Sequence, residues 1–347
     1  MIDKNFCLSS YMAFRYIERD DMDFSADITH RPIVRIPSSE KTIVHNSSDT
    51  DRAIQNVFNN LQNEKLGLLL SGGMDSATLA SYMKGKDAYT FRFLGGTFQK
   101  EELQRAEHFA AYNKMNLHYV DIDWEKIPSI LGVVMQSKGA PVHSIEPQLY
   151  LAAKQAQKDG ITRLIIGDGS DYVFGGMDKL LSRDWNYSDW KNRFIYLDPA
   201  LVLIQPEDID YLFKRYSHGK DEINWLQMMD EVATEESYSS YENAFYAADI
   251  PYTDPYDKLL LGEPLDLARI RNGESKYVIR ELFHSKYPDI PVPEKLPMPR
   301  PVDAYFKDWV GPSRPEFRKD IPMSELTGNQ KWQLWCAEQF LNMIDPA

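Results

Sequence analysis

A six-residue loop, SGGMDS at residues 71–76, most constrains what this chain can fold into. An apolar run at residues 66–70 precedes it and a helix-like stretch at residues 76–83 follows, so we expect a strand, a tight turn and a helix. Gly72 and Gly73 let the backbone approach a ligand closely, and the start of the helix directs free N–H groups toward it. The loop is therefore expected to bind an anion such as a phosphate.

The chemistry of this loop differs from that of the common phosphate-binding loop. The chain contains no GxxxxGK motif, so no loop lysine neutralises the phosphates. The loop carries Asp75 instead, and a carboxylate favours phosphate binding only if a Mg²⁺ ion lies between them. The alternative is a tight turn without a ligand. Five fixed residues, each used at about 7%, recur by chance in about one in two thousand chains of this length, which favours the anion site.

Strand-like and helix-like segments alternate over residues 66–177, and beyond residue 177 strand-like runs disappear and helix-like stretches dominate. Strands joined by helices form parallel sheets. We therefore predict an α/β fold, a parallel sheet with flanking helices, and a helix-rich second half. The predicted organisation is an N-terminal segment of unclear role at 1–65 and a domain at 66–347, divided into 66–177 and 178–347. The predicted strands are 66–70, 88–94, 117–122 and 163–166, and the predicted helices are 76–83, 101–115, 125–135, 147–158, 208–216, 222–248, 275–285 and 329–343.

Composition excludes several classes of protein. The 347 residues include 39 Lys+Arg against 52 Asp+Glu, a formal net charge of −13, so a nucleic-acid backbone would be repelled. The two cysteines, Cys7 and Cys336, stand far apart without a CxxC motif, which argues against a zinc knuckle or a disulfide framework. No signal-peptide pattern opens the chain and no long apolar window occurs, so we expect a cytoplasmic protein without membrane contact.

A second loop, GDGSDYVFGG at residues 167–176, begins where the predicted strand at 163–166 ends. In a parallel sheet, ligands collect at the carboxyl ends of the strands. The two loops are therefore expected to face one pocket, in which Asp171 shares a metal ion with Asp75. The alternative is a turn rich in glycine and aspartate.

Four segments resemble the synthetase domain of the asparagine synthetases, and they occur in the same order. These are the two loops, IPYTD at residues 250–254 and SKYVIR at residues 275–280. That domain belongs to the PP-loop ATP pyrophosphatases, with the adenine nucleotide alpha hydrolase-like fold, and its relatives include β-lactam synthetases and lasso-peptide cyclases. The resemblance covers about residues 60–310. It implies that a carboxylate attacks the α-phosphorus of ATP, and that ammonia or an amine then displaces AMP from the acyl-adenylate.

The resemblance also implies which residues bind ATP and Mg²⁺. Asp75 and Asp171 match the magnesium ligands of the family. Lys276 matches a lysine that stabilises the negative charge of the transition states, and Arg280 lies on the same helix face one turn later. Either cation could instead be solvated. The expected nucleotide-binding residues are Leu70, Ser71, Gly72, Gly73, Asp75, Ser76, Phe93 and Gly167.

Asp168 occupies a position that varies among the relatives, which have glutamate in asparagine synthetases and tyrosine in β-lactam synthetases. A carboxylate can orient or deprotonate an ammonium ion, so Asp168 favours an ammonia-like nucleophile. The segment at residues 139–147 stands where the family contacts the acceptor carboxylate. Its candidate substrate contacts are His143, Ser144 and Glu146, unless these are loop and cap residues, and Asp249 is a further candidate beside the IPYTD segment.

The sequence departs from the asparagine synthetases at its start, where the family has a nucleophilic cysteine at position 2 and a glutaminase domain. Here residue 2 is Ile2, and only residues 1–65 precede the predicted domain. We therefore expect nitrogen to come from free ammonia, a separate glutaminase or an amine substrate. The leading prediction is an ATP-dependent, AMP-forming amide ligase for a small-molecule carboxylate. The alternatives are an amine-condensing or cyclising ligase and an inactive nucleotide-binding regulator, and a homo-oligomer is compatible with each.

Overall fold

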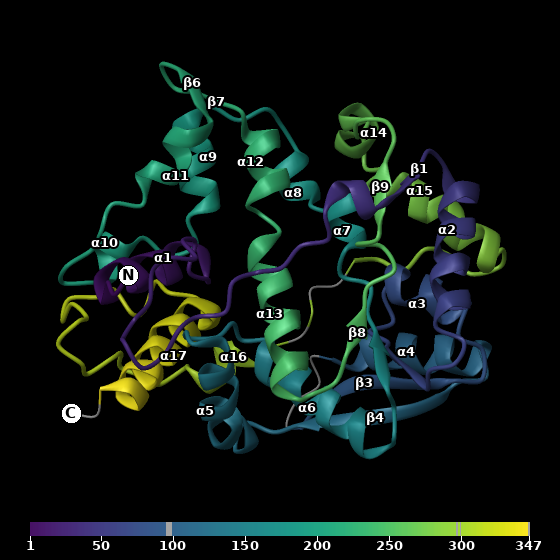
Figure 1. Ribbon diagram of the computed structural model, residues 1–347, viewed down its shortest axis with the longest axis horizontal. Coiled ribbons are helices and arrows are strands. Elements are labelled where there is room, and N and C mark those ends of the chain that lie inside the picture. Colours follow the sequence, from purple (N-terminus) through teal and green to yellow (C-terminus); the bar gives the residue numbers. More distant parts are fainter. Residues whose placement is uncertain (95–98, 296–297, 299, 346–347) are drawn as a thin grey trace.

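The largest sheet of the computed structural model has five strands in the order β4-β3-β2-β5-β8, and every neighbouring pair is parallel (Figure 1). The structure describes residues 1–94, 99–295, 298 and 300–345. Helices connect the strands, as the alternating patterns predicted, so the predicted α/β fold is confirmed. The strands of this sheet are β2 (Leu66–Leu69), β3 (Asp87–Phe93), β4 (Asn116–Ile122), β5 (Arg163–Ile165) and β8 (Tyr252–Thr253).

Side chains of the strands alternate between two cores, one on each face of the sheet. Tyr89 of β3 packs with α5 and α6 in one core, whereas its neighbour Ala88 packs with α3 and α4 in the other. Both residues are buried. Burial on both faces accounts for the near-continuous apolar runs in the sequence. The helices of this half are α3 (Met74–Ala80), α4 (Lys100–Tyr112), α5 (Lys126–Lys138), α6 (Glu146–Lys158) and α7 (Ser170–Val173).

Residues 1–65 contribute to both cores. Helix α1 (Lys4–Phe14) is buried along most of its length, and the Tyr11 hydroxyl donates a 2.9 Å hydrogen bond to the carbonyl of Val142. Helix α2 (Ser47–Asn60) packs Ile54 into the core that contains α3 and α4. The remaining elements of this segment are the short helix η1 (Ser38–Glu40) and β1 (Thr42–Val44). The segment is therefore an integral part of the packed fold.

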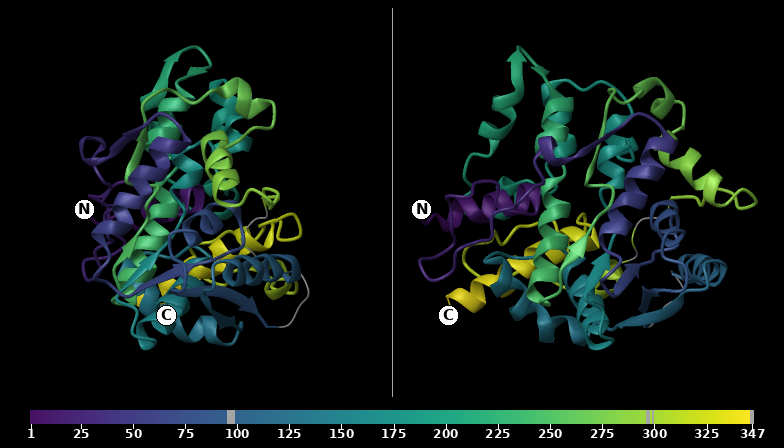
Figure 2. Two further views of the ribbon diagram at one scale, coloured as in Figure 1. Left: turned by 90° about the vertical axis from the view of Figure 1, so that its right-hand side faces the viewer. Right: turned by 45° about the vertical axis from the view of Figure 1, so that its right-hand side comes forward.

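The second half is mainly helical, as predicted, and helix α13 crosses the middle of the molecule. Figures 1 and 2 show α13 with α1 and α17 on one side and the large sheet on the other. Helix α17 begins with a capping box formed by Thr327 and Gln330. The helices are α8 (Asp178–Leu181), α9 (Tyr187–Phe194), α10 (Pro199–Val202), α11 (Asp210–Tyr216), α12 (Trp225–Glu231), α13 (Glu235–Ala247), α14 (Leu267–Arg271), α15 (Tyr277–Lys286), α16 (Val302–Tyr305) and α17 (Gly328–Ile344).

The prediction that strands disappear beyond residue 177 is wrong. Strand β8 extends the large sheet next to β5, and β9 (Leu259–Leu261) pairs in parallel with β1. Strands β6 (Ser217–Gly219) and β7 (Glu222–Ile223) form a hairpin, so the predicted helix at 222–248 is divided into β7, α12 and α13. Each of these strands has only two or three residues, which is too short to produce a period-two pattern in the sequence.

The length and hydropathy of a helix determine whether it can cross a membrane. Among the residues that the structure describes, no helix is both long enough and apolar enough to cross a bilayer.

Candidate active site

The two glycine-containing loops lie at the carboxyl ends of β2 and β5, which are neighbours in the sheet. In the first loop, Gly72 has φ +78°, and a Cβ atom there would lie 2.7 Å from the backbone nitrogen of Ala106. Only glycine fits this left-handed, crowded position. The hydroxyls of Ser71 and Ser76 lie 3.1 Å apart and close the turn. The predicted strand, turn and helix are thus formed, with α3 starting at Met74.

Asp75, Asp171 and Lys276 meet between the loops. The Lys276 Nζ lies 2.6 Å from Asp75 Oδ2 and 2.5 Å from Asp171 Oδ1. The hydroxyl of Ser170 donates a 2.7 Å hydrogen bond to the other oxygen of Asp75. A Cβ atom on Gly176 would lie 2.0 Å from Asp171 Oδ1, so a glycine is required at this position for the close approach. The structure therefore brings together three residues that are far apart in the sequence.

A second lysine, Lys295, also reaches this cluster, and the sequence prediction missed it. Its Nζ lies 3.0 Å from Asp171 Oδ1 and donates a 2.8 Å hydrogen bond to the carbonyl of Gly176. Lys295 stands in a proline-rich stretch without helical or strand periodicity, so local sequence patterns could not place it. Two ammonium groups therefore face the two carboxylates.

The charges of the cluster shift the pKa values of its members. Burial lowers the pKa of Lys276, but the charges of Asp75 and Asp171 outweigh burial and raise it, so the ammonium stays protonated at neutral pH. Burial raises the pKa of Asp171, but Lys276 and Lys295 lower it by more. Lys276 and Asp171 therefore stabilise each other in their charged forms.

The cluster fits a magnesium ion that is bound jointly with phosphates. Asp75 and Asp171 already converge on one cationic nitrogen, and two carboxylates with phosphate oxygens are a typical ligand set for Mg²⁺. The described residues contain no group of three or more His, Cys, Asp or Glu arranged to hold a metal. The remaining ligands of such an ion would be phosphate or water oxygens.

Two adjoining cavities, of about 130 and 360 Å³, lie beside the cluster. The lining residues that they share are Ser71, Asp75, Glu102, Asp168, Asp171 and Met298. Among the other predicted nucleotide-binding residues, Leu70, Ser76 and Gly167 line the smaller cavity, and Gly72 and Gly73 line the larger. Phe93 lines neither, and its backbone N–H donates a 2.8 Å hydrogen bond to Gln99.

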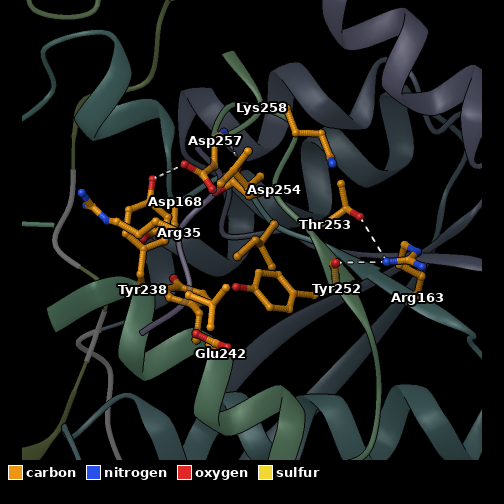
Figure 3. A pocket seen from close by; sticks show the side chains of 14 residues that line it. Arg35, Arg163, Asp168, Tyr238, Glu242, Tyr252, Thr253, Asp254, Asp257 and Lys258 are labelled. Atoms are coloured by element: carbon orange, nitrogen blue, oxygen red, sulfur yellow. Dashed lines mark hydrogen bonds between the residues drawn. The ribbon is translucent and has the colours of Figure 1, made fainter. Parts of the chain in front are cut away.

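Asp168 faces both of these cavities and a third one. Burial raises the pKa of its carboxyl to about 7, against the opposing effect of a 2.7 Å hydrogen bond from Ser237. The third cavity, of about 270 Å³, is shown in Figure 3, where Asp168, Asp254 and Asp257 gather on one side. Asp254 accepts a 2.6 Å hydrogen bond from the backbone N–H of Gly169. Through this hydrogen bond, the IPYTD segment stabilises the second loop.

The remaining predicted residues are divided between the site and the rest of the fold. Arg280 lines the 360 Å³ cavity, and its Nε donates a 2.7 Å hydrogen bond to the carbonyl of Ser275. His143 and Ser144 lie beside Arg300, which lines the same cavity: the Arg300 Nη1 is 3.2 Å from His143 Nε2 and 3.4 Å from Ser144 Oγ. These residues are brought toward the site.

Glu146 and Asp249, which the sequence predicted as substrate contacts, are not brought to the site. Glu146 is fully buried, 2.5 Å from Lys138 Nζ and 2.7 Å from Asn243 Nδ2, so its carboxylate is already paired. Asp249 is exposed in the turn that precedes β8, at the amino ends of the strands, and its carbonyl accepts a hydrogen bond from Gln157. The sequence pattern could not exclude either, because their partners come from distant segments.

Comparison with known proteins places the chain in a family. The model of the asparagine synthase family matches residues 58–260, which is more than half of the chain. The chain therefore belongs to the asparagine synthase family, and this membership supports an ATP-dependent, ligase-type enzyme. Lys276, Arg280 and Lys295 lie beyond the matched residues, and all three line the 360 Å³ cavity.

Three of the solved structures that match show distant likeness. NMN synthetase from Francisella tularensis matches at 17% identity and a TM-score of 0.26, over 38% of this chain and 56% of that protein. The U34-tRNA thiolase NcsA from Methanococcus maripaludis, with its [4Fe-4S] cluster, matches at 13% identity and a TM-score of 0.32, over 85% of this chain and 78% of that protein. NAD+ synthetase from Burkholderia pseudomallei matches at 12% identity and a TM-score of 0.24, over 72% of this chain and 91% of that protein. No curated protein sequence matches. Structural scores this low carry no argument about this chain.

Proposed function

We propose that this protein is an amide synthetase that uses ATP to adenylate a small-molecule carboxylate and then transfers ammonia to the acyl group. The products are the amide, AMP and pyrophosphate. The observation that carries the proposal is the convergence of Asp75 and Asp171 on Lys276, at the glycine loops and beside a carboxyl whose pKa lies near 7. Family membership supplies the class of reaction.

In the first half-reaction, a carboxylate oxygen of the acceptor bonds to the α-phosphorus of ATP, and the bond from that phosphorus to pyrophosphate breaks. Negative charge accumulates on the departing pyrophosphate. Lys276 and Lys295 offset this charge, since both ammonium groups already face the carboxylate cluster at the loop. The loop at residues 71–76 binds the departing group. A Mg²⁺ ion held by Asp75 and Asp171 would neutralise phosphate charge there.

In the second half-reaction, ammonia attacks the acyl carbon and the bond from that carbon to AMP breaks. The new amide nitrogen must lose a proton. Asp168 accepts this proton, because its carboxyl faces the cavities beside the two loops. The pKa of about 7 lets Asp168 exchange a proton near neutral pH. The hydrogen bond from Ser237 orients this carboxyl.

Within residues 1–347 neither cysteine is suited to act as a glutaminase nucleophile, so we expect ammonia to be supplied to this segment rather than produced by it. Cys7 and Cys336 are both fully buried. Burial raises the pKa of each thiol to about 12, so almost no thiolate forms at neutral pH. We expect no release of glutamate from glutamine by the isolated chain.

The test is a screen of carboxylates with ATP, Mg²⁺ and ammonium chloride, in which AMP, ADP and pyrophosphate are separated and quantified. We expect AMP and pyrophosphate in equal amounts, only when both a carboxylate and ammonium are present. The Asp75→Asn and Asp171→Asn variants should lose this activity. Formation of ADP and phosphate, or turnover that needs an organic amine rather than ammonium, would contradict the proposal.

A further inference from the structure

A second cationic cluster lies near the two cavities that adjoin Asp75 and Asp171. In this cluster, two arginines contact the same nitrogen atom of one histidine. The Nη1 atoms of Arg15 and Arg300 each lie 3.2 Å from His143 Nε2. Arg15 comes from the end of α1, Arg300 from the proline-rich stretch and His143 from the loop before α6. The tertiary fold therefore assembles this pair of guanidinium groups from three distant segments.

The cluster carries more positive than negative charge. Arg15 forms a 2.9 Å ion pair with Glu236 and lies over the ring of Tyr196. Within the part of the chain that the structure describes, Arg300 forms no ion pair with a carboxylate. Burial and the two arginines lower the pKa of His143 well below its usual value, so the imidazole is neutral. Two guanidinium groups and one carboxylate leave a surplus of one positive charge.

The hydrogen bonds of the cluster are incomplete as well. The Nε atom of Arg15 and the Oε1 atom of Glu236 are buried and have no hydrogen-bond partner among the described residues. Burial and the charge of Arg15 lower the pKa of Arg300, which shows that the pairing of like charges opposes its charged form. An anion placed against the two arginines would offset the repulsion between them and could accept a hydrogen bond from Arg15, since guanidinium groups bind carboxylates through two hydrogen bonds.

A cavity of about 1000 Å³ opens beside this cluster. Arg15, Glu236 and Lys295 line it, together with the aromatic rings of Phe14, Tyr16 and Tyr196. Lys295 also lines the 360 Å³ cavity, so the two spaces adjoin. Cavities of about 300–1,000 Å³ hold drug-sized ligands, and a single amino acid would fill only a small part of this one.

We propose that Arg15 and Arg300 bind a second acid group of the acceptor, distinct from the carboxylate that is adenylated, and that the body of the acceptor occupies the 1000 Å³ cavity. The inference rests on the proposed function, and it names the acceptor class: a diacid larger than an amino acid, with an apolar or aromatic body. The N-terminal segment, which supplies Arg15, Phe14 and Tyr16, then determines acceptor specificity.

The acid group that the arginines hold cannot be the reacting one. A carboxylate gripped by two guanidinium groups has its lone pairs occupied, which makes it a poor nucleophile toward phosphorus. The reacting carboxylate instead approaches the loop at residues 71–76, where Lys276 lies. Two acid groups on one acceptor account for both positions.

The test measures binding, not turnover. The chain of residues 1–347 is saturated with Mg²⁺ and a non-hydrolysable ATP analogue, so the phosphate loop is filled. Calorimetric titrations then compare three diacids that carry an aromatic body with their monoamides: N-benzoyl-L-aspartate, N-benzoyl-L-glutamate and N-acetyl-L-aspartyl-L-phenylalanine. We expect at least one diacid to bind about tenfold to a hundredfold more tightly than its monoamide, as charge-assisted hydrogen bonds imply. Equal affinity within all three pairs would overturn the inference.

Variants separate anion binding from a structural role. In Arg300→Gln and Arg15→Gln the preference for the diacid should vanish, whereas Arg19→Gln, an exposed arginine of the same segment, should retain it. Arg300→Gln should melt at the same temperature as the wild type or higher, because it relieves repulsion between like charges. A diacid preference that survives in Arg300→Gln would refute the proposal.

Failure of this inference and failure of the proposed function give different results. If the preference for the diacid depends on Arg300 but no AMP forms, the acid-binding site is supported and the proposed synthetase activity is refuted. If monoacids are turned over with AMP formation and with the same KM in wild type and Arg300→Gln, the synthetase activity is supported and the acid-binding site is refuted.

Discussion

Replacing Lys276 with glutamine should nearly abolish turnover while increasing the dependence of stability on Mg²⁺. Lys276 is only 5% exposed, and its ammonium is shared by Asp75 and Asp171 at 2.6 and 2.5 Å. Its charge acts where negative charge develops in the transition state, so its removal should cost about 2.7–4 kcal/mol, or a hundredfold to a thousandfold in kcat. The affinity for ATP should change much less.

The same substitution leaves two carboxylates close together with one fewer cation. Removing one partner of a buried pair costs about 3–5 kcal/mol, and an exposed pair contributes about 0–1 kcal/mol. Asp75 and Asp171 are partly exposed and Asp171 retains Lys295, so we expect a loss of about 1–3 kcal/mol in the free energy of unfolding without metal. Millimolar Mg²⁺ should recover much of this loss, because it can take the place of the ammonium between the carboxylates.

The assay combines denaturant unfolding, with and without Mg²⁺, and steady-state kinetics of AMP formation. Lys286→Gln is the matched control, because Lys286 is the last residue of α15, the helix that Lys276 precedes, and forms a 2.6 Å ion pair with Asp51 away from the loops. The control should lose some stability that Mg²⁺ does not restore, and it should keep its activity. A kcat reduced less than threefold in Lys276→Gln, or a loss of stability that Mg²⁺ leaves unchanged, would refute the reasoning.

Three further predictions concern single residues. The rate of amide formation should rise with pH through about 7 as Asp168 ionises. The Asp168→Asn variant should lose this rising part of the pH–rate profile. If the rise is unchanged in the variant, Asp168 is not the base. Gly176→Ala should abolish turnover and cost about 1–3 kcal/mol of stability, because its Cβ would collide with Asp171, whereas Gly132→Ala, with open space around it, should keep full activity in the same assays. Asp249→Gly should preserve activity and raise the melting temperature slightly, since φ is +57° there; a raised KM would restore Asp249 as a substrate contact.

The second half of the chain shows where sequence-based prediction reaches its limit. Helix α15 was predicted within two residues of its bounds, because its apolar residues recur at helical spacing over several turns. Strand β8 was missed, because two residues carry no period, although they complete the large sheet next to β5. Element type follows from local repetition, so the shortest elements escape it.

The sequence by itself determined the parts of the site that local pattern and backbone geometry specify. The loop at residues 71–76 and the loop at residues 167–176 follow apolar strands, and parallel pairing places both at one edge of the sheet. Their glycines mark positions where a Cβ atom would collide, as at Gly72 and Gly176. These features act over a few residues and therefore leave a signature in the chain.

Only the tertiary structure decided how the charged side chains outside the recognised motifs pair. Glu146 resembled a substrate contact, but Lys138 pairs with it inside the core, while Lys295 and Arg15 reach the cavities from segments without a readable pattern. The physical reason is that an ion pair depends on distance in space and on the polarity around it, and neither is encoded in the spacing of residues along the chain.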